Sequence, residues 1–113
     1  MQESRIIIAS EAGIAIRSLG DIPDLLGVTV GTDGLILTEQ DLSPEFFDLR
    51  TGLAGEVFQK FTNYKMPVAL VIPQANVYGQ RFSELAYEHK THPLIRFVSS
   101  VTEAKVWLGA AKV

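Results

Sequence analysis

Residues 51–72 have the sequence TGLAGEVFQKFTNYKMPVALVI, and this stretch decides the fold class. Its first part places apolar residues at positions 53, 54, 57, 58 and 61, which is the spacing of one buried face of a helix. Its last part, VALVI at 68–72, is apolar at every position, as expected for a strand that is covered on both faces. A helix that leads into a doubly covered strand predicts an α/β protein with helices packed on a sheet.

The same kinds of pattern predict the elements on either side of this stretch. Isoleucine-rich segments at 5–10 and 13–19 predict an N-terminal β-hairpin. Further strands are expected at 35–38 and 95–99. Helices are expected after Asp21, from Ser43, from Thr51, over 82–89 and from Ser100. The predicted order is ββαβαβαβα, with a mixed β-sheet flanked by helices in a single domain that spans residues 1–113.

Composition and charge limit the class of protein. The chain has 113 residues, no cysteine and a formal net charge of −3. Without cysteine a disulfide framework and thiolate metal sites are excluded, and a cytoplasmic location is expected. The lysines and arginines are scattered, so neither nucleic acid nor a membrane surface is expected as a partner. The apolar run Ile6–Ile8 is too short for a signal peptide or a membrane span.

Over residues 35–108 the chain resembles an uncharacterised bacterial family, domain of unknown function 4180 (DUF4180). The resemblance is carried by LSPEFFDLRTGLAGEVFQKFTNY, by IRFVSS, and by the pair Glu103 and Ala104. It implies no particular activity. More remotely, the strand order and the helix after the third strand resemble the STAS domain of anti-sigma-factor antagonists, a signalling fold that binds a kinase-like partner. This second resemblance implies a STAS-like sheet and a regulatory protein partner.

Thr51 is the residue on which the STAS resemblance bears most directly. STAS proteins of that type carry Asp-Ser-Ser-Gly at the start of this helix, and the hydroxyl residue before the glycine is phosphorylated. Here the stretch is Asp48-Leu49-Arg50-Thr51-Gly52, so the resemblance implies that Thr51 is a phosphoacceptor. From the residues alone, Thr51 is expected to cap the helix. A phosphate would also be stabilised there by the helix N-terminus and by Arg50.

Glycines and phenylalanines close to Thr51 are further candidates. Gly52 and Gly55 weaken a helix, which predicts either close packing on a neighbouring element or approach of a partner to the helix backbone. Of the adjacent Phe46 and Phe47, one is expected in the core. The other is expected to share this burial, with a partly exposed contact point for a partner as the alternative.

Carboxylates and imidazoles offer two possible metal sites. Carboxylates gather between the third strand and its helix at Glu39, Asp41, Glu45 and Asp48. They are expected to cap helices or to face solvent, with a hard-cation site as the alternative. His89 and His92 are expected at a helix end, with a metal pair as the alternative. Since no phosphate-binding loop or GxSxG motif is present, we predict no cofactor, no metal and no catalytic residue.

Two functional hypotheses follow from these residues. The first is a non-enzymatic regulatory or protein-interaction domain that binds a protein partner through residues 39–55. Its candidate contact or phosphoacceptor residues are Glu45, Phe46, Asp48, Arg50, Thr51, Gly52 and Gly55. The second is a small-molecule or anion-binding domain, with enzymatic activity left open, that uses the same segment together with Tyr78 and Arg81. These two residues follow the central strand, where α/β folds often bind ligands.

Overall fold

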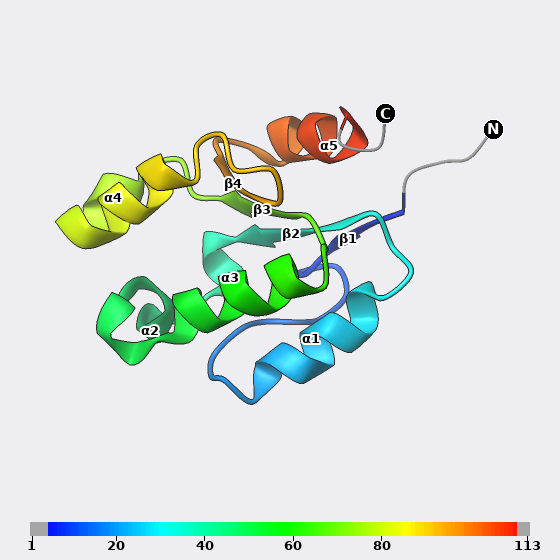
Figure 1. Ribbon diagram of the computed structural model, residues 1–113, viewed down its shortest axis with the longest axis horizontal. Helices are drawn as coiled ribbons and strands as arrows, with labels where there is room; N and C mark the ends of the chain where they lie inside the picture. Colours follow the sequence, from blue (N-terminus) through cyan, green and yellow to red (C-terminus); the bar gives the residue numbers. More distant parts are fainter. Residues whose placement is uncertain (1–4, 111–113) are drawn as a thin grey trace.

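The strands form one parallel sheet at the centre of the chain (Figure 1). The computed structural model describes residues 5–110. Its strands are β1 (Ile6–Ile8), β2 (Gly34–Thr38), β3 (Val68–Val71) and β4 (Ile95–Val98), which lie side by side in this order. Leu35 pairs with Val68, so the predicted adjacency of the two central strands is confirmed. Every pair of neighbouring strands is parallel.

Helices connect the strands in the order βαβαβαβα. The α-helices are α1 (Asp21–Thr29), α2 (Pro44–Phe47), α3 (Leu53–Asn63), α4 (Gln80–Glu88) and α5 (Val101–Ala110). Three short 3₁₀ helices lie between them: η1 (Glu39–Asp41), η2 (Leu49–Thr51) and η3 (Ala75–Tyr78). Among residues 5–110, no helix combines the length and the apolar character needed to cross a membrane.

The predicted N-terminal hairpin is wrong, and with it the mixed sheet and the order ββαβαβαβα. After β1 the chain turns at Gly13, whose φ is +72°, but it does not return along β1. Instead the Ile16 N–H donates to the carbonyl of Asp41 at 2.8 Å, and Ile16 forms an isolated parallel bridge with Leu42. Ile16 is fully buried. The alternating isoleucines of residues 13–19 therefore belong to a segment that packs against the loop after β2. The STAS-like sheet, which was expected to include a hairpin, is not shown.

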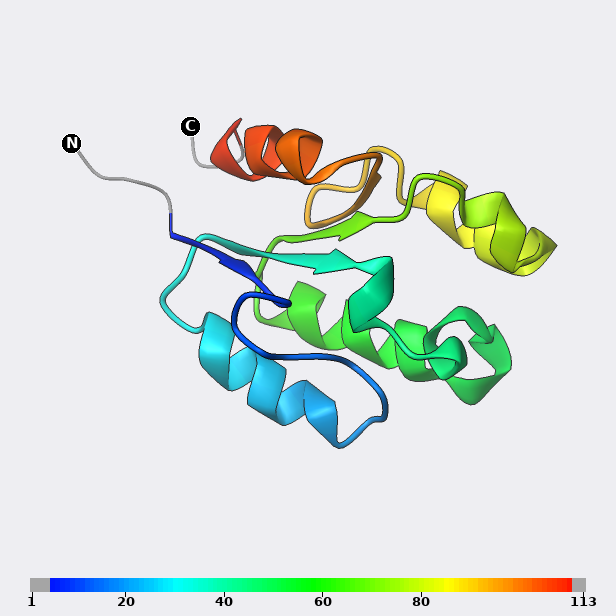
Figure 2. The ribbon, with the colours of Figure 1, turned by 180° about the vertical axis from the view of Figure 1, so that it is seen from behind.

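Each face of the sheet has its own core, because successive residues of a strand point to opposite sides. Along β2, Leu35 and Leu37 point into the core that contains the buried faces of α1 and α3. Ile36 points to the other side, where it packs in a cluster with Ala104 and Leu108 of α5. Figures 1 and 2 show the same layers from front and back, with α1 and α3 below the sheet and α5 above it. The predicted double coverage of the central strands is confirmed.

The strand order determines where a binding site can form. In doubly wound sheets the order reverses, and a crevice opens at the carboxyl ends of the strands where it does so. Here the order β1-β2-β3-β4 contains no reversal within residues 5–110. A crevice at this edge must therefore be built by the segments that follow β2 and β3, which are η1, α2 and η2 on one side and η3 and α4 on the other.

Gly34 allows α5 to pack closely on β2, which gives a prediction. A Cβ atom at position 34 would lie 2.6 Å from Cδ2 of Leu108, a side chain that is fully buried. We expect Gly34→Ala to lower the free energy of unfolding by about 1–3 kcal/mol, because the added methyl displaces a packed side chain. Leu108→Ala should cost about 2–5 kcal/mol. The double variant should lose less than the sum, because Leu108→Ala leaves room for the added methyl, which in turn fills part of the cavity. Urea unfolding measures all three, and additive losses would contradict this account.

Candidate functional site

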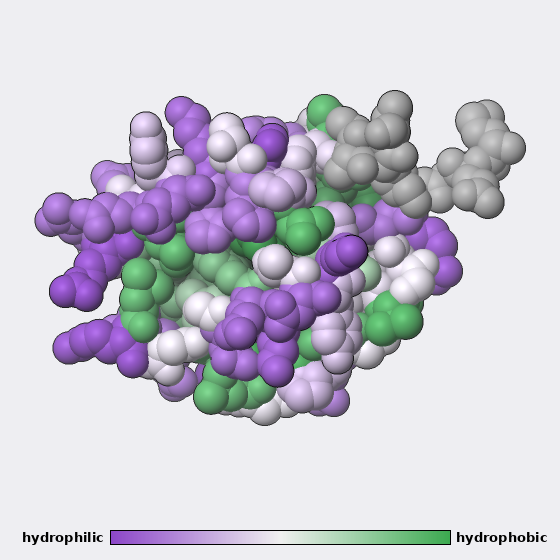
Figure 3. All heavy atoms as spheres, viewed as in Figure 1, coloured by the Kyte–Doolittle hydropathy of each residue, from purple (hydrophilic) through white to green (hydrophobic). Residues whose placement is uncertain are grey.

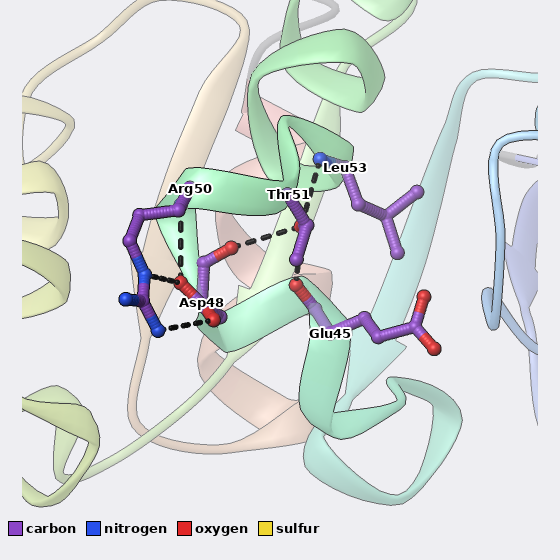
Figure 4. A network of polar contacts seen from close by, with 5 residues as sticks. All are labelled: Glu45, Asp48, Arg50, Thr51 and Leu53. Carbon is purple, nitrogen blue, oxygen red and sulfur yellow. Dashed lines mark hydrogen bonds and ion pairs between the residues drawn. The ribbon is translucent and has the colours of Figure 1, made fainter.

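The Thr51 side chain makes hydrogen bonds to α2, to the residue that follows α2 and to the first residue of α3 (Figure 4). Its Oγ1 lies 2.7 Å from the carbonyl oxygen of Glu45 and 2.8 Å from that of Asp48. A hydroxyl has one proton, so it donates to one of these carbonyls at a time. The same oxygen accepts the N–H of Leu53, the first residue of α3, at 3.2 Å. Thr51 therefore caps α3 as expected, although the N-cap residue itself is Gly52.

Arg50 is held by Asp48 and points away from Thr51 (Figure 4). Its Nε lies 3.0 Å from Oδ1 of Asp48, and its second terminal nitrogen lies 3.0 Å from Oδ2. The hydrogen bond from the Arg50 side chain is the main reason why the pKa of Asp48 is lowered. Because this pair is exposed, it adds little to stability. The pairing of Arg50 with a phosphate on Thr51 would need a different arrangement of this side chain.

The two glycines of this segment have different roles. Gly52 has a φ of +79°, a left-handed conformation that residues with a side chain rarely adopt. Gly55 lies inside α3 with an ordinary φ. Among the described residues, a Cβ atom at either position would meet no atom of another element within 4 Å, so the expected close packing on a neighbouring element is wrong for both. The backbone conformation explains Gly52, and nothing in the structure explains Gly55.

This difference predicts opposite effects of alanine. Gly52→Ala should lower the free energy of unfolding by about 1–2 kcal/mol, because the left-handed conformation is unfavourable for alanine. Gly55→Ala should raise it by about 0.5–1 kcal/mol, because alanine favours the helix and has open space around it. Denaturant unfolding at one pH compares the two variants with the natural chain. Shifts of the same sign would contradict these assignments.

The two adjacent phenylalanines are buried to different degrees, which corresponds to the alternative and not to the favoured expectation of shared burial. Phe46 is fully buried in the core. Phe47 is half-buried, and its ring is stacked on that of Tyr78 with 3.8 Å between centroids. It also meets the ring of Phe82 edge-on at 5.1 Å. Phe46 was the candidate contact residue, but its burial prevents contact with a partner in this structure, and Phe47 is the phenylalanine that a partner can reach.

Tyr78 joins the segment after β3 to the segment after β2. Its hydroxyl donates a hydrogen bond to Oε2 of Glu39, a residue 39 positions earlier in the chain. This bond, with a smaller effect of burial, raises the pKa of Tyr78 to about 12. The contact was not predicted, because no local pattern relates the two residues. It brings the two candidate regions of the sequence, residues 39–55 and the loop with Tyr78 and Arg81, into one site.

A groove of about 720 Å³ lies between these two regions at the carboxyl edge of the sheet. It is lined by Pro44, Phe47, Asp48, Leu49, Arg50, Tyr78, Gly79, Gln80, Arg81 and Phe82. We call it the edge groove. Of the candidates named from the sequence, Asp48, Arg50, Tyr78 and Arg81 line it, and Glu45, Phe46, Thr51, Gly52 and Gly55 do not. The side chain of Arg81 is exposed and makes no hydrogen bond or ion pair within residues 5–110.

Three of the four carboxylates make contacts within the protein. Asp41 is buried, and its Oδ2 accepts the backbone N–H of Thr38 at 2.8 Å and the hydroxyl of Thr38 at 3.0 Å. It therefore closes the turn after β2, as expected of a capping carboxylate. Glu39 accepts the hydrogen bond from Tyr78, and Asp48 forms an ion pair with Arg50. In the described part of the chain, no three histidine or acidic side chains are grouped as metal ligands.

The histidines shape the end of α4. Nδ1 of His89 lies 2.8 Å from the carbonyl oxygen of Leu85. Nδ1 of His92 accepts the backbone N–H groups of Leu94 and Ile95, each at 3.0 Å, so this nitrogen carries no proton. Burial, together with the neighbouring His89, lowers the pKa of His92. Both histidines thus make local contacts to the backbone.

The Tyr78–Glu39 bond leads to a prediction for alkaline pH. Since the pKa of Tyr78 is raised from 10.0 to about 12 in the folded protein, its contribution to stability is complete below pH 10. It is lost as the pH rises through 10 toward about 12. Glu39→Gln should return the pKa toward 10, because the carboxylate that holds the phenolic proton is gone. Ultraviolet titration in a Tyr64→Phe/Tyr87→Phe background isolates Tyr78. An unchanged titration in the Glu39→Gln variant would contradict the bond.

These observations define a class of protein, an α/β domain with a singly wound parallel sheet and a groove formed by the segments after its two central strands. Residues 1–108 match the family described as Domain of unknown function (DUF4180). The chain belongs to this family, so the resemblance drawn from the sequence is confirmed. Comparison with the curated proteins and with the solved structures gave no match.

Proposed function

We propose that this DUF4180 domain is a non-enzymatic interaction module that binds a segment of a protein partner in the edge groove. The observation that supports this most strongly is the set of side chains in the groove. Phe47 and Tyr78 present aromatic surface, and Arg50 and Arg81 lie on the same groove. Tyrosine, phenylalanine and arginine are the residues enriched in protein interfaces, and tyrosine and arginine dominate their binding energy.

The walls of the edge groove are held in place by contacts that do not involve a ligand. The stacking of Phe47 on Tyr78 and the bond from Tyr78 to Glu39 join its two sides. The Thr51 hydroxyl fixes the chain between α2 and α3 behind one wall. A surface that is already ordered loses little conformational freedom when it binds, which favours association. Thr51 and Glu45 thus support the binding surface in this proposal and do not line it.

The resemblance to anti-sigma-factor antagonists suggests how binding is regulated. Esterification of Thr51 by phosphate removes the proton that its Oγ1 donates to the carbonyls of Glu45 and Asp48. It also adds negative charge beside those carbonyl oxygens. In this proposal the modification loosens the segment between α2 and α3 and changes the wall of the edge groove.

The test is crosslinking and capture from an extract of the source cells, with purified variants compared side by side. Arg81→Glu should lower capture of the partner about tenfold, because it reverses an exposed charge in the edge groove. Lys105→Glu is the matched control, since Lys105 is also exposed and lies on α5, outside the edge groove. Thr51→Glu should change capture while the protein remains folded. Equal capture by the natural chain, Arg81→Glu and Thr51→Glu, all folded by circular dichroism, would contradict the proposal.

A second candidate function uses the same groove for a small anion. Arg81 has no partner in the described structure, and the start of α4 at Gly79 has no side-chain cap. Thermal unfolding with phosphate and carboxylate metabolites separates the two functions, because a bound ligand raises the melting temperature. A response that Arg81→Glu abolishes would favour the anion, whereas the interaction module should show none.

A further inference from the structure

A second groove lies between α1 and α3 and is mainly apolar. Its volume is about 640 Å³. It is lined by Leu19, Ile22, Pro23, Leu26, Gly27, Val30, Glu56, Lys60 and Tyr64. Leu19, Val30 and Tyr64 are large apolar side chains that are 54%, 69% and 64% exposed. Figure 3 shows hydrophobic patches near both ends of α1 with hydrophilic side chains between them. Apolar side chains gathered around one groove indicate an interaction surface.

We propose that this α1–α3 groove is the interface of a symmetric homodimer. The charges at the groove are what point to a second copy. Glu56 and Lys60 lie one helical turn apart on α3, with 3.7 Å between Oε1 and Nζ. A two-fold axis that crosses α3 between them brings Glu56 of each copy opposite Lys60 of the partner subunit. The same patch is then complementary to itself, which is the condition for a two-fold interface.

Because Glu56 and Lys60 are partly exposed, each can replace its ion-pair partner in the same chain by the corresponding residue of the second copy. The side chains of Glu56 and Lys60 are 39% and 47% exposed, so water screens their bond within one chain and that bond is weak. In the dimer each charge keeps an opposite charge beside it, and the excluded water strengthens the attraction. The apolar side chains around the groove supply the hydrophobic contribution. Among them, Tyr64 is a tyrosine, one of the residue types that often dominate the binding energy of interfaces.

The dimer does not depend on the proposed function. The α1–α3 groove and the edge groove share no lining residue. A homodimer formed through α1 and α3 therefore leaves both copies of the edge groove free. Loss of dimerisation and loss of partner capture are separate results, each measured on its own variants.

Charge exchange on α3 tests the dimer by sedimentation equilibrium of the full chain. The natural chain should dimerise with a dissociation constant in the micromolar range. Glu56→Lys and Lys60→Glu alone should each weaken dimerisation at least about tenfold, because they place like charges across the axis. An equal mixture of these two variants should form a heterodimer, and the double exchange Glu56→Lys/Lys60→Glu should restore the homodimer. A natural chain that stays monomeric to roughly 1 mM, or a mixture that forms no heterodimer, would overturn the proposal.

A tyrosine pair provides the matched control for the apolar contact. Tyr64→Ser should weaken dimerisation at least about tenfold, because the ring is expected to be buried between the copies. Tyr87→Ser changes a tyrosine of α4 that is 76% exposed and lies outside the groove, so its dissociation constant should be unchanged. Thermal unfolding confirms that both variants fold. Equal dissociation constants for the two variants would show that the α1–α3 groove is not the interface.

Discussion

The burial of the two central strands on both faces is the constraint on which the rest of the structure depends. Residues 35–37 of β2 and 68–70 of β3 are completely shielded from solvent. Their backbone N–H and C=O groups must therefore pair within the sheet, and both faces must be covered by helices. Because the strands are parallel, the chain crosses over the sheet between them, and α1 and α3 cover one face in doing so. α5 then covers the other face, where Gly34 lets it approach closely.

The same constraint places the edge groove. Parallel strands end at one edge of the sheet, so the segments after β2 and β3 emerge beside each other. Within residues 5–110 the order of the strands has no reversal that would open a crevice there. The edge groove is instead formed by the helices that follow these strands. The contacts of Tyr78 with Glu39 and Phe47 hold its two sides together. The edge groove is thus a product of irregular segments fixed on a rigid sheet, an arrangement that is common for functional sites.

Thr51 and Gly52, at the start of α3, support the edge groove and do not line it. Gly52 provides a left-handed turn, and the Thr51 hydroxyl links the carbonyl side of α2 to the first N–H of α3. Phe46 anchors the segment in the core, while its neighbour Phe47 reaches the groove. In the proposed regulation, a change at Thr51 therefore acts through the shape of the segment, because Thr51 does not line the edge groove.

Local patterns in the sequence determined the α/β class, the buried face of α3 and the cap at Thr51, because each depends on residues a few positions apart. The family was also evident from contiguous motifs. Only the tertiary structure decided that the isoleucines of residues 13–19 pack against the loop after β2, since a strand and a packed segment share the same alternation. It also decided the bond between Tyr78 and Glu39 and the edge groove beside it. These contacts join residues far apart in the chain, and their formation depends on how the whole sheet is assembled.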